Sequence, residues 1–134
     1  MKHKILVIDD EAMIRKTIRA QLEGTIYEIV EAEDGEMGIQ VLDSENVLEV
    51  VVIICDVRMP KVNGVEAVAY FRQNYPLIPV TVLTGYPDVH LAVDFIKDGV
   101  VDYLVKPVKK DKLLEVVSAA VRQHKLFAKP QLMA

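Results

Sequence analysis

A chain of 134 residues, 51% of them hydrophobic, is long enough to bury one core and too short for two ordinary domains. Its longest clean apolar run, 50–55, falls far short of the roughly 20 residues that a membrane span needs, and the N-terminus lacks the apolar length of a secretory signal. A net charge of −4 disfavours a nucleic-acid surface, and the single Cys55 fits a small core residue. We therefore expect one cytoplasmic domain that by itself binds neither membrane nor nucleic acid.

The first part of the chain alternates short apolar runs with amphipathic stretches. The first helix is indicated by Ile14, Ile18 and Leu22 at four-residue spacing. The third apolar run is β-branched and does not alternate with polar residues, which indicates a strand buried on both faces. In chain order we expect a strand over 4–8, a helix closed by Gly24, a strand over 26–32, a helix capped by Asp34 with Gly38, Val41 and Leu42 inward, a loop over 43–46 and a strand over 50–55.

The second part continues the alternation. Two prolines in 75–79 must stop the third helix before that segment, and Pro130 makes the last residues a tail. In chain order we expect a helix with Val65, Val68 and Phe71 on its inner side, a strand over 80–83, a helix from about 88 to 99 with Val89, Ala92, Val93 and Ile96 inward, a strand over 101–105 and a helix over 110–126.

Strict alternation of strand and helix predicts an α/β fold with a five-stranded parallel doubly wound sheet. Helices must cover both faces of such a sheet, because each crossover is right-handed and must cover apolar strand surface. The chain length, and a site built from the first, third, fourth and fifth strands, favour the strand order 2-1-3-4-5. We assign 1–127 to the domain and 128–134 to a C-terminal tail or the start of a linker.

Polar residues stand where the predicted strands end. They are Asp9 and Asp10 after the first strand, Asp56 after the third, Thr84 after the fourth and Lys106 after the fifth. Because parallel strands end at one edge of the sheet, these side chains should converge there. Two unit charges ~5 Å apart repel by roughly 3 kcal/mol at an effective dielectric near 20, so clustered acids need a cation. A few carboxylates with room for water suit Mg²⁺ or Mn²⁺ better than zinc.

Each of these residues also has a plainer interpretation. Asp9 and Asp10 taken alone could simply cap the first helix, and Thr84 with the following glycine could simply form a turn. Asp56, however, follows the most buried strand and is held on a rigid element, as a carboxylate nucleophile should be. Lys106 is restrained by the proline after it, and a cation so placed can stabilise a phosphoryl group.

These residues lie in four recognisable motifs. Together they resemble the bacterial response regulator receiver domain of two-component signalling, over about residues 3 to 126, and this family has the flavodoxin-like (βα)5 fold. The motifs are Ile8-Asp9-Asp10-Glu11, Asp56-Val57-Arg58-Met59-Pro60, Thr84-Gly85 and Tyr103-Leu104-Val105-Lys106-Pro107.

The resemblance implies a phosphorylation-dependent switch rather than a turnover enzyme. Asp56 would accept a phosphoryl group from a phosphohistidine on a sensor histidine kinase. Asp10, Asp56 and the backbone carbonyl of Arg58 would ligate Mg²⁺, and Asp9 would act through water. Lys106 would pair with the phosphoryl oxygens, and the domain would assist only its own phosphorylation and dephosphorylation.

The resemblance also implies how the signal leaves the site. Thr84 would bind the phosphoryl group, Tyr103 would turn inward, and the Lys106–Pro107 peptide bond would be cis. The fourth helix, fifth strand and fifth helix would then dimerise or dock an output partner or domain. Arg58 and Tyr86 stand two residues beyond the acceptor and the switch threonine, and we expect them to hinder the water that removes the phosphoryl group.

Two functions from other classes compete with this interpretation. A haloacid-dehalogenase-like phosphatase or phosphotransferase also uses an aspartyl nucleophile, but it places a second acid two residues later, where this chain has Arg58. A flavin-binding electron carrier needs hydroxyls and amides around phosphate after its first strand, and Asp9-Asp10-Glu11 would repel phosphate. His3, His90 and His124 show no metal-ligand spacing.

Overall fold

The computed structural model describes residues 3–44, 47–57, 64–85 and 89–128. All paired strands are parallel and their order in the sheet is β2-β1-β3-β4-β5, which confirms the predicted order. The strands are β1 (His3–Ile8), β2 (Tyr27–Ala32), β3 (Val50–Asp56), β4 (Val80–Thr84) and β5 (Asp102–Val105). The helices are α1 (Ala12–Gln21), α2 (Gly35–Ser44), α3 (Gly64–Asn74), α4 (Val89–Lys97) and α5 (Lys110–Ala128), with a short 3-10 helix η1 (Val47–Glu49).

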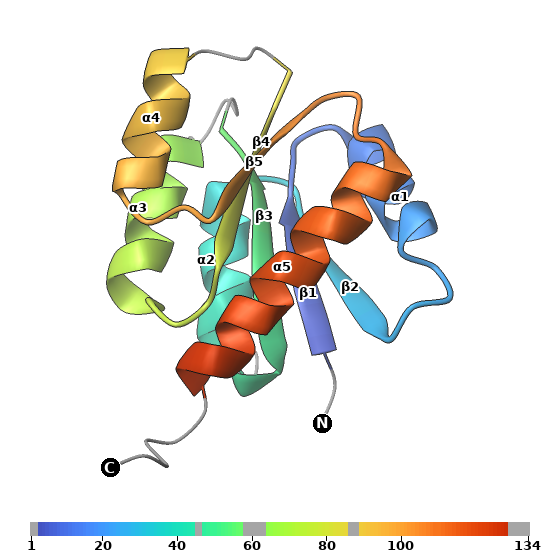
Figure 1. Ribbon diagram of the computed structural model, residues 1–134, viewed down its shortest axis with the longest axis horizontal. Helices are drawn as coiled ribbons and strands as arrows, with labels where there is room; N and C mark the ends of the chain where they lie inside the picture. The colour runs from blue at the N-terminus through green and yellow to red at the C-terminus, as the bar shows by residue number, and fades with distance from the viewer. Residues whose placement is uncertain (1–2, 45–46, 58–63, 86–88, 129–134) are drawn as a thin grey trace.

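Helices cover both faces of the sheet (Figure 1). Helices α1 and α5 pack on one face, and α2, α3 and α4 pack on the other. Alternation along β1 divides its side chains between two cores, because successive residues of a strand point to opposite faces. Ile5 and Val7 join the core under α1 and α5, whereas Leu6 and Ile8 join the core under α2 and α3.

The middle of the sheet is fully enclosed. All seven residues of β3 are buried, including Asp56 at its end, and Cys55 is a buried free thiol, as expected. The edge strand β5 is different, since only Leu104 of its four residues is buried. Residues at the carboxyl end of β3 therefore stand on the most rigidly packed part of the fold.

The helix ends follow the predicted signals only in part. Asp34 caps α2, because its Oδ1 accepts a hydrogen bond from the Met37 amide at 2.8 Å. Gly24 does not close α1 as predicted, since the helix ends at Gln21 with Leu22 as its C-cap, and Gly24, in a left-handed conformation with φ +84°, turns the chain two residues later. The loop predicted over 43–46 begins too early, since α2 continues through Ser44 and keeps hydrogen-bonding its backbone. No helix within the described ranges is long and apolar enough to cross a membrane.

The inward faces of two helices differ from the prediction. Val93 and Ile96 of α4 were expected inside but are 45% and 59% exposed, while Phe95 is 3% exposed. Apolar residues occur on more than one side of this short helix, and packing selects the side that carries Phe95, which joins the core under α2 and α3. Val65 is also exposed, because it lies in the first turn of α3 at the margin of the core.

Candidate functional site

Three carboxylates meet at the carboxyl edge of the sheet. β1 pairs with β3 through Ile8 and Cys55, so Asp9 and Asp56 follow paired residues on adjacent strands. With Asp10 they form a group whose carboxylate oxygens can all lie within 4.8 Å of one another. Asp9 and Asp56 are buried and Asp10 is exposed, so the cluster is fixed on one side and open to water on the other.

A lysine ammonium completes the cluster. Lys106 Nζ lies 2.9 Å from Asp9 Oδ2, 3.0 Å from Asp56 Oδ2 and 3.2 Å from Glu11 Oε1. Burial alone would lower the pKa of this lysine, but hydrogen bonds and charge from Asp9 and Asp56 outweigh burial and raise it. Lys106 is therefore a permanent cation beside the two buried acids.

The raised pKa of Asp9 reflects mainly its burial. Burial raises its pKa to about 6, against the hydrogen bond from the Glu11 amide (2.8 Å) and the ammonium of Lys106, which both lower it. The charge of nearby Asp56 contributes a smaller part of the same rise. Burial and the neighbouring acid therefore outweigh the Lys106 ammonium at this carboxyl group.

The donor set fits a hard divalent cation. Every candidate side-chain ligand is a carboxylate oxygen, and the three acids are spaced for a single ion. Asp10 faces solvent, which leaves coordination places for water, as Mg²⁺ prefers. Arg58, whose backbone carbonyl was predicted as a further ligand, and Tyr86 lie outside the described residues.

The ends of strands β4 and β5 bring Thr84 beside Lys106. Thr84 is buried and pairs in register with Val105, and its carbonyl accepts the Lys106 amide at 2.8 Å. The Lys106–Pro107 peptide bond is cis. The hydroxyl and the ammonium therefore belong to adjoining residues of a hydrogen-bonded strand pair.

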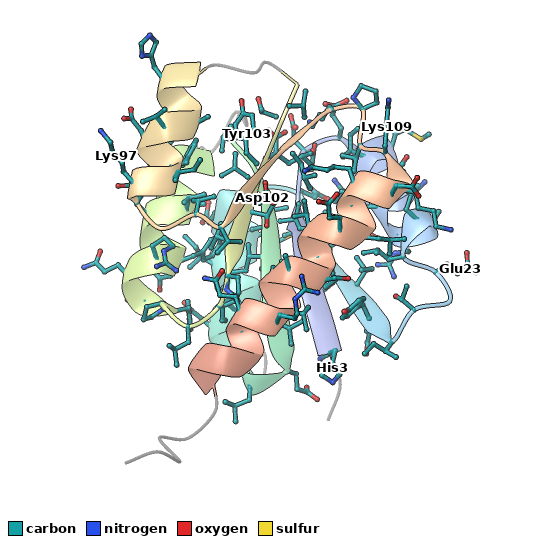
Figure 2. All side chains as sticks on the ribbon, in the orientation of Figure 1. His3, Glu23, Lys97, Asp102, Tyr103 and Lys109 are labelled. Atoms are coloured by element: carbon teal, nitrogen blue, oxygen red, sulfur yellow. The ribbon has the colours of Figure 1, made fainter. Side chains whose placement is uncertain are left out.

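Tyr103 lies two residues before the exposed end of β5. It is half-buried, pairs in register with Val82, and packs against the core under α2, α3 and α4. Figure 2 shows Tyr103 and Lys109 toward the same end of the molecule, with His3 at the opposite end. Tyr103 therefore lies between the core and the site edge of the sheet.

Two charged residues contact the site without having been assigned a role from the sequence. Glu11 is the third acid of the first motif, and its carboxylate reaches Lys106. Arg15 donates from Nη1 to the Asp9 carbonyl at 2.7 Å and from Nε to Glu31 Oε1 at 2.9 Å. The available signal for this contact was an arginine one turn into the helix that follows the acids. Sequence alone did not reveal the contact, because the partner Glu31 lies in a separate element, 16 residues along the chain.

The fold and site together define an α/β domain with an acidic centre and an adjacent lysine, and comparison with known proteins gives its family. Residues 5–118 match the family model of the response regulator receiver domain. A receiver domain from Clostridium thermocellum superposes with a TM-score of 0.85 at 34% identity, covering 92% of this chain and 98% of that one. The chain belongs to the response regulator receiver domain family, whose members act in two-component signalling systems.

Curated relatives are transcriptional regulatory proteins that are longer than this chain. FixJ of Bradyrhizobium diazoefficiens is 32% identical over 133 residues, which is 99% of this chain and 63% of FixJ. ZraR of Klebsiella oxytoca is 34% identical over 126 residues, which is 94% of this chain and 28% of ZraR. The chain thus spans less than two thirds of the length of either relative.

Proposed function

We propose that this receiver domain is a phosphorylation-dependent switch whose acceptor is Asp56. The observation that carries the proposal is the contact of Lys106 with both Asp56 and Asp9, beside a third carboxylate. A phosphohistidine of a sensor histidine kinase would be the donor. An Asp56 carboxylate oxygen would bond to phosphorus as the phosphorus–nitrogen bond breaks, and the imidazole nitrogen would keep the electron pair and take up a proton.

The acids would hold Mg²⁺, or Mn²⁺, through Asp10, Asp56 and the backbone carbonyl of Arg58, with Asp9 acting through water. When bound, the ion would supply positive charge to the phosphoryl oxygens. Lys106 would move from its carboxylate partners toward the same oxygens. Burial of Asp56 supports its role, because a nucleophile on an enclosed strand is held in one orientation.

Thr84 and Tyr103 would carry the signal away from the site. The Thr84 hydroxyl would bind a phosphoryl oxygen, and the Tyr103 ring would move from its half-buried place into the space that the hydroxyl leaves. Such coupling typically amounts to ~1–3 kcal/mol, or about 5–150-fold in the affinity for a partner. The register of β4 with β5 supports this coupling, because Tyr103 pairs with Val82, two residues before Thr84, so that both side chains lie on the same face of the sheet.

The receiving surface would be formed by α4, β5 and α5. Val93, Ile96 and Val105 support this assignment, since all three are exposed apolar side chains on α4 and β5. A second copy of the domain or an output partner or domain would bind there. The assignment of 1–127 to the receiver domain, of 128–134 to a tail or linker, and of the protein to the cytoplasm belongs to the same proposal.

Arg58 and Tyr86 would slow loss of the phosphoryl group by hindering the attacking water. Arg58→Ala and Tyr86→Ala should each lose phosphate faster than the wild type, in an assay that follows release from the isolated phosphoprotein. Unchanged rates in both variants would remove this part of the proposal without affecting the acceptor.

Phosphorylation by a small donor tests the central role. With Mg²⁺ and acetyl phosphate, intact-mass spectrometry should detect one acid-stable, base-labile phosphoryl adduct, suppressed by chelator and absent in Asp56→Asn. Asp34→Asn is the matched control, because asparagine caps α2 as well as aspartate does and the site keeps its acids. An adduct that persists in Asp56→Asn, or multiple turnover of phosphate monoesters, would contradict the proposal.

A further inference from the structure

Arg15 reaches the backbone of the acidic site from α1. Its Nη1 donates to the Asp9 carbonyl at 2.7 Å, and only 13% of its side chain is exposed. The accepting carbonyl belongs to the peptide bond that joins Asp9 to Asp10. An arginine that holds this carbonyl therefore restrains the orientation of both acids at once.

The backbone and side chain of Asp9 are held by several partners. Its amide donates to the Ala32 carbonyl at 3.1 Å, and its Oδ1 accepts the Glu11 amide at 2.8 Å. The contact from Arg15 restrains the remaining backbone polar group of Asp9. Asp9 is thus fixed to β2 on one side and to α1 on the other, which leaves little freedom for the peptide plane.

Arg15 is itself held in place by Glu31 on β2. Arg15 Nε lies 2.9 Å from Glu31 Oε1, and Arg19 Nη2 lies 2.7 Å from Glu31 Oε2. Burial opposes ionisation of Glu31, but hydrogen bonds from Arg19 and Arg15 outweigh it and lower the pKa of the carboxyl. Glu31 is therefore a fixed anion between two guanidinium groups, and it orients Arg15 toward the Asp9 carbonyl.

We infer that Arg15, oriented by Glu31, is a positioning residue that sets the geometry of the metal-binding acids. Arg15 would not touch Mg²⁺; it would hold the Asp9–Asp10 peptide in the plane from which Asp10 reaches the ion directly and Asp9 reaches it through water. This inference rests on the proposed function, because it concerns the ion that the same acids would hold. Outer-shell partners of metal ligands act in this way when they fix ligand orientation.

Electrostatics and positioning predict opposite effects when Arg15 is replaced. A guanidinium near the site repels a divalent cation, so its removal should tighten Mg²⁺ binding if charge alone matters. Removal should weaken binding if the contact with the Asp9 carbonyl matters more. The sign of the change therefore separates the two accounts.

The experiment measures the Mg²⁺ dissociation constant of the whole chain by isothermal titration calorimetry. Arg15→Met keeps an unbranched side chain without its donors and should weaken Mg²⁺ binding about tenfold, the lower end of what loss of an outer-shell partner costs. Arg15→Lys, which can restore a donor to the Asp9 carbonyl, should recover part of the affinity. Acetyl phosphate labelling should show the same defect at low Mg²⁺ and little defect at saturating Mg²⁺.

Arg72→Met is the matched control, and urea unfolding of each variant measures structural damage separately. Arg72 also donates to backbone carbonyls, those of Asp98 and Pro76, but does so at the end of α3. The Arg72→Met variant should lose stability while keeping the wild-type Mg²⁺ affinity. Unchanged or tighter binding in Arg15→Met, with a wild type that binds Mg²⁺ and accepts phosphate, overturns the inference alone. A wild type that binds no Mg²⁺ overturns both it and the proposed function.

Discussion

Strands β3 and β5 both end at the site, but they are packed in opposite ways. β3 is buried along its whole length and delivers Asp56, whereas β5 is an edge strand whose Val105 is 44% exposed and which delivers Tyr103 and Lys106. The residue that must stay in place thus stands on the enclosed strand. Tyr103 and Lys106, two of the residues proposed to move, stand on or directly after the strand with fewer neighbours, where local rearrangement costs less.

The same contrast extends to the helices. α5 packs directly against β3 and presents a nearly continuous buried face, including Leu113, Val117 and Val121. α4 packs on the sheet through Phe95 but leaves Val93 and Ile96 exposed. A fully packed centre and a partly covered edge are therefore two regions of one fold, and their stabilities should respond differently to substitution.

Truncation inside β3 should have the largest effect. Ile53 is fully buried, and Ile53→Ala should lower the free energy of unfolding by about 3–4 kcal/mol, because it removes buried methyl groups and leaves a cavity. Urea denaturation followed by circular dichroism measures the change. A loss below about 1 kcal/mol would mean that β3 is not the rigid centre assumed here.

Close packing of α2 on β1 should be the next most sensitive feature. A Cβ on Gly38 would lie 2.4 Å from Ile8 Cδ1 and 3.0 Å from Ile8 Cγ1, inside the enclosed core. Gly38→Ala should cost about 1–3 kcal/mol through overpacking, despite the better helix propensity of alanine. Gly85→Ala is the control, since its Cβ would meet only Lys106 Cδ at 3.7 Å. Equal stability of the two variants in thermal denaturation would refute close packing at Gly38.

Acidification should lower the free energy of unfolding through His124 on α5, by a smaller amount than the two substitutions above. Burial, and then the charge of His3 on β1, lower the pKa of His124 below 6.5 in the folded protein. As the pH falls, His124 of the unfolded chain binds a proton at a higher pH than His124 of the folded protein does. The free energy of unfolding therefore decreases as the pH falls through and below 6.5. His124→Gln should flatten this part of the stability profile between pH 7.5 and pH 5.5, measured by urea titrations. Parallel profiles for the two proteins would exclude the role of His124.

Substitution at the edge should have the smallest effect on stability. Ile96→Ser should change the free energy of unfolding by no more than about 0.5 kcal/mol, because the side chain is already largely in water. The same change should reduce any self-association or partner binding of the phosphorylated domain, measured by analytical ultracentrifugation. A large loss of stability would show that the exposed face of α4 is more tightly packed than the contrast between the enclosed centre and the edge requires.

Local patterns predicted most of the enclosed centre and less of the edge. The unalternating run of β3 indicated burial on both faces, and strand-end acids indicated Asp9, Asp10 and Asp56 as a cluster, because both depend on neighbours along the chain. The orientation of α4 was missed because Phe95 competes with Val93 and Ile96 for the sheet, and only packing decides between them. The pairing of Arg15 with Glu31 was missed because it joins separate elements and leaves no periodic signal.

Identification of the modified side chain tests the central claim most directly. The phosphorylated domain would be reduced with borohydride, which converts an aspartyl phosphate to homoserine, and then digested and sequenced by tandem mass spectrometry. We expect homoserine at position 56 alone, in a reaction that requires Mg²⁺. Homoserine at position 9 or 10, or no conversion in protein that carries the phosphoryl mass, would contradict the assignment of Asp56 as the acceptor.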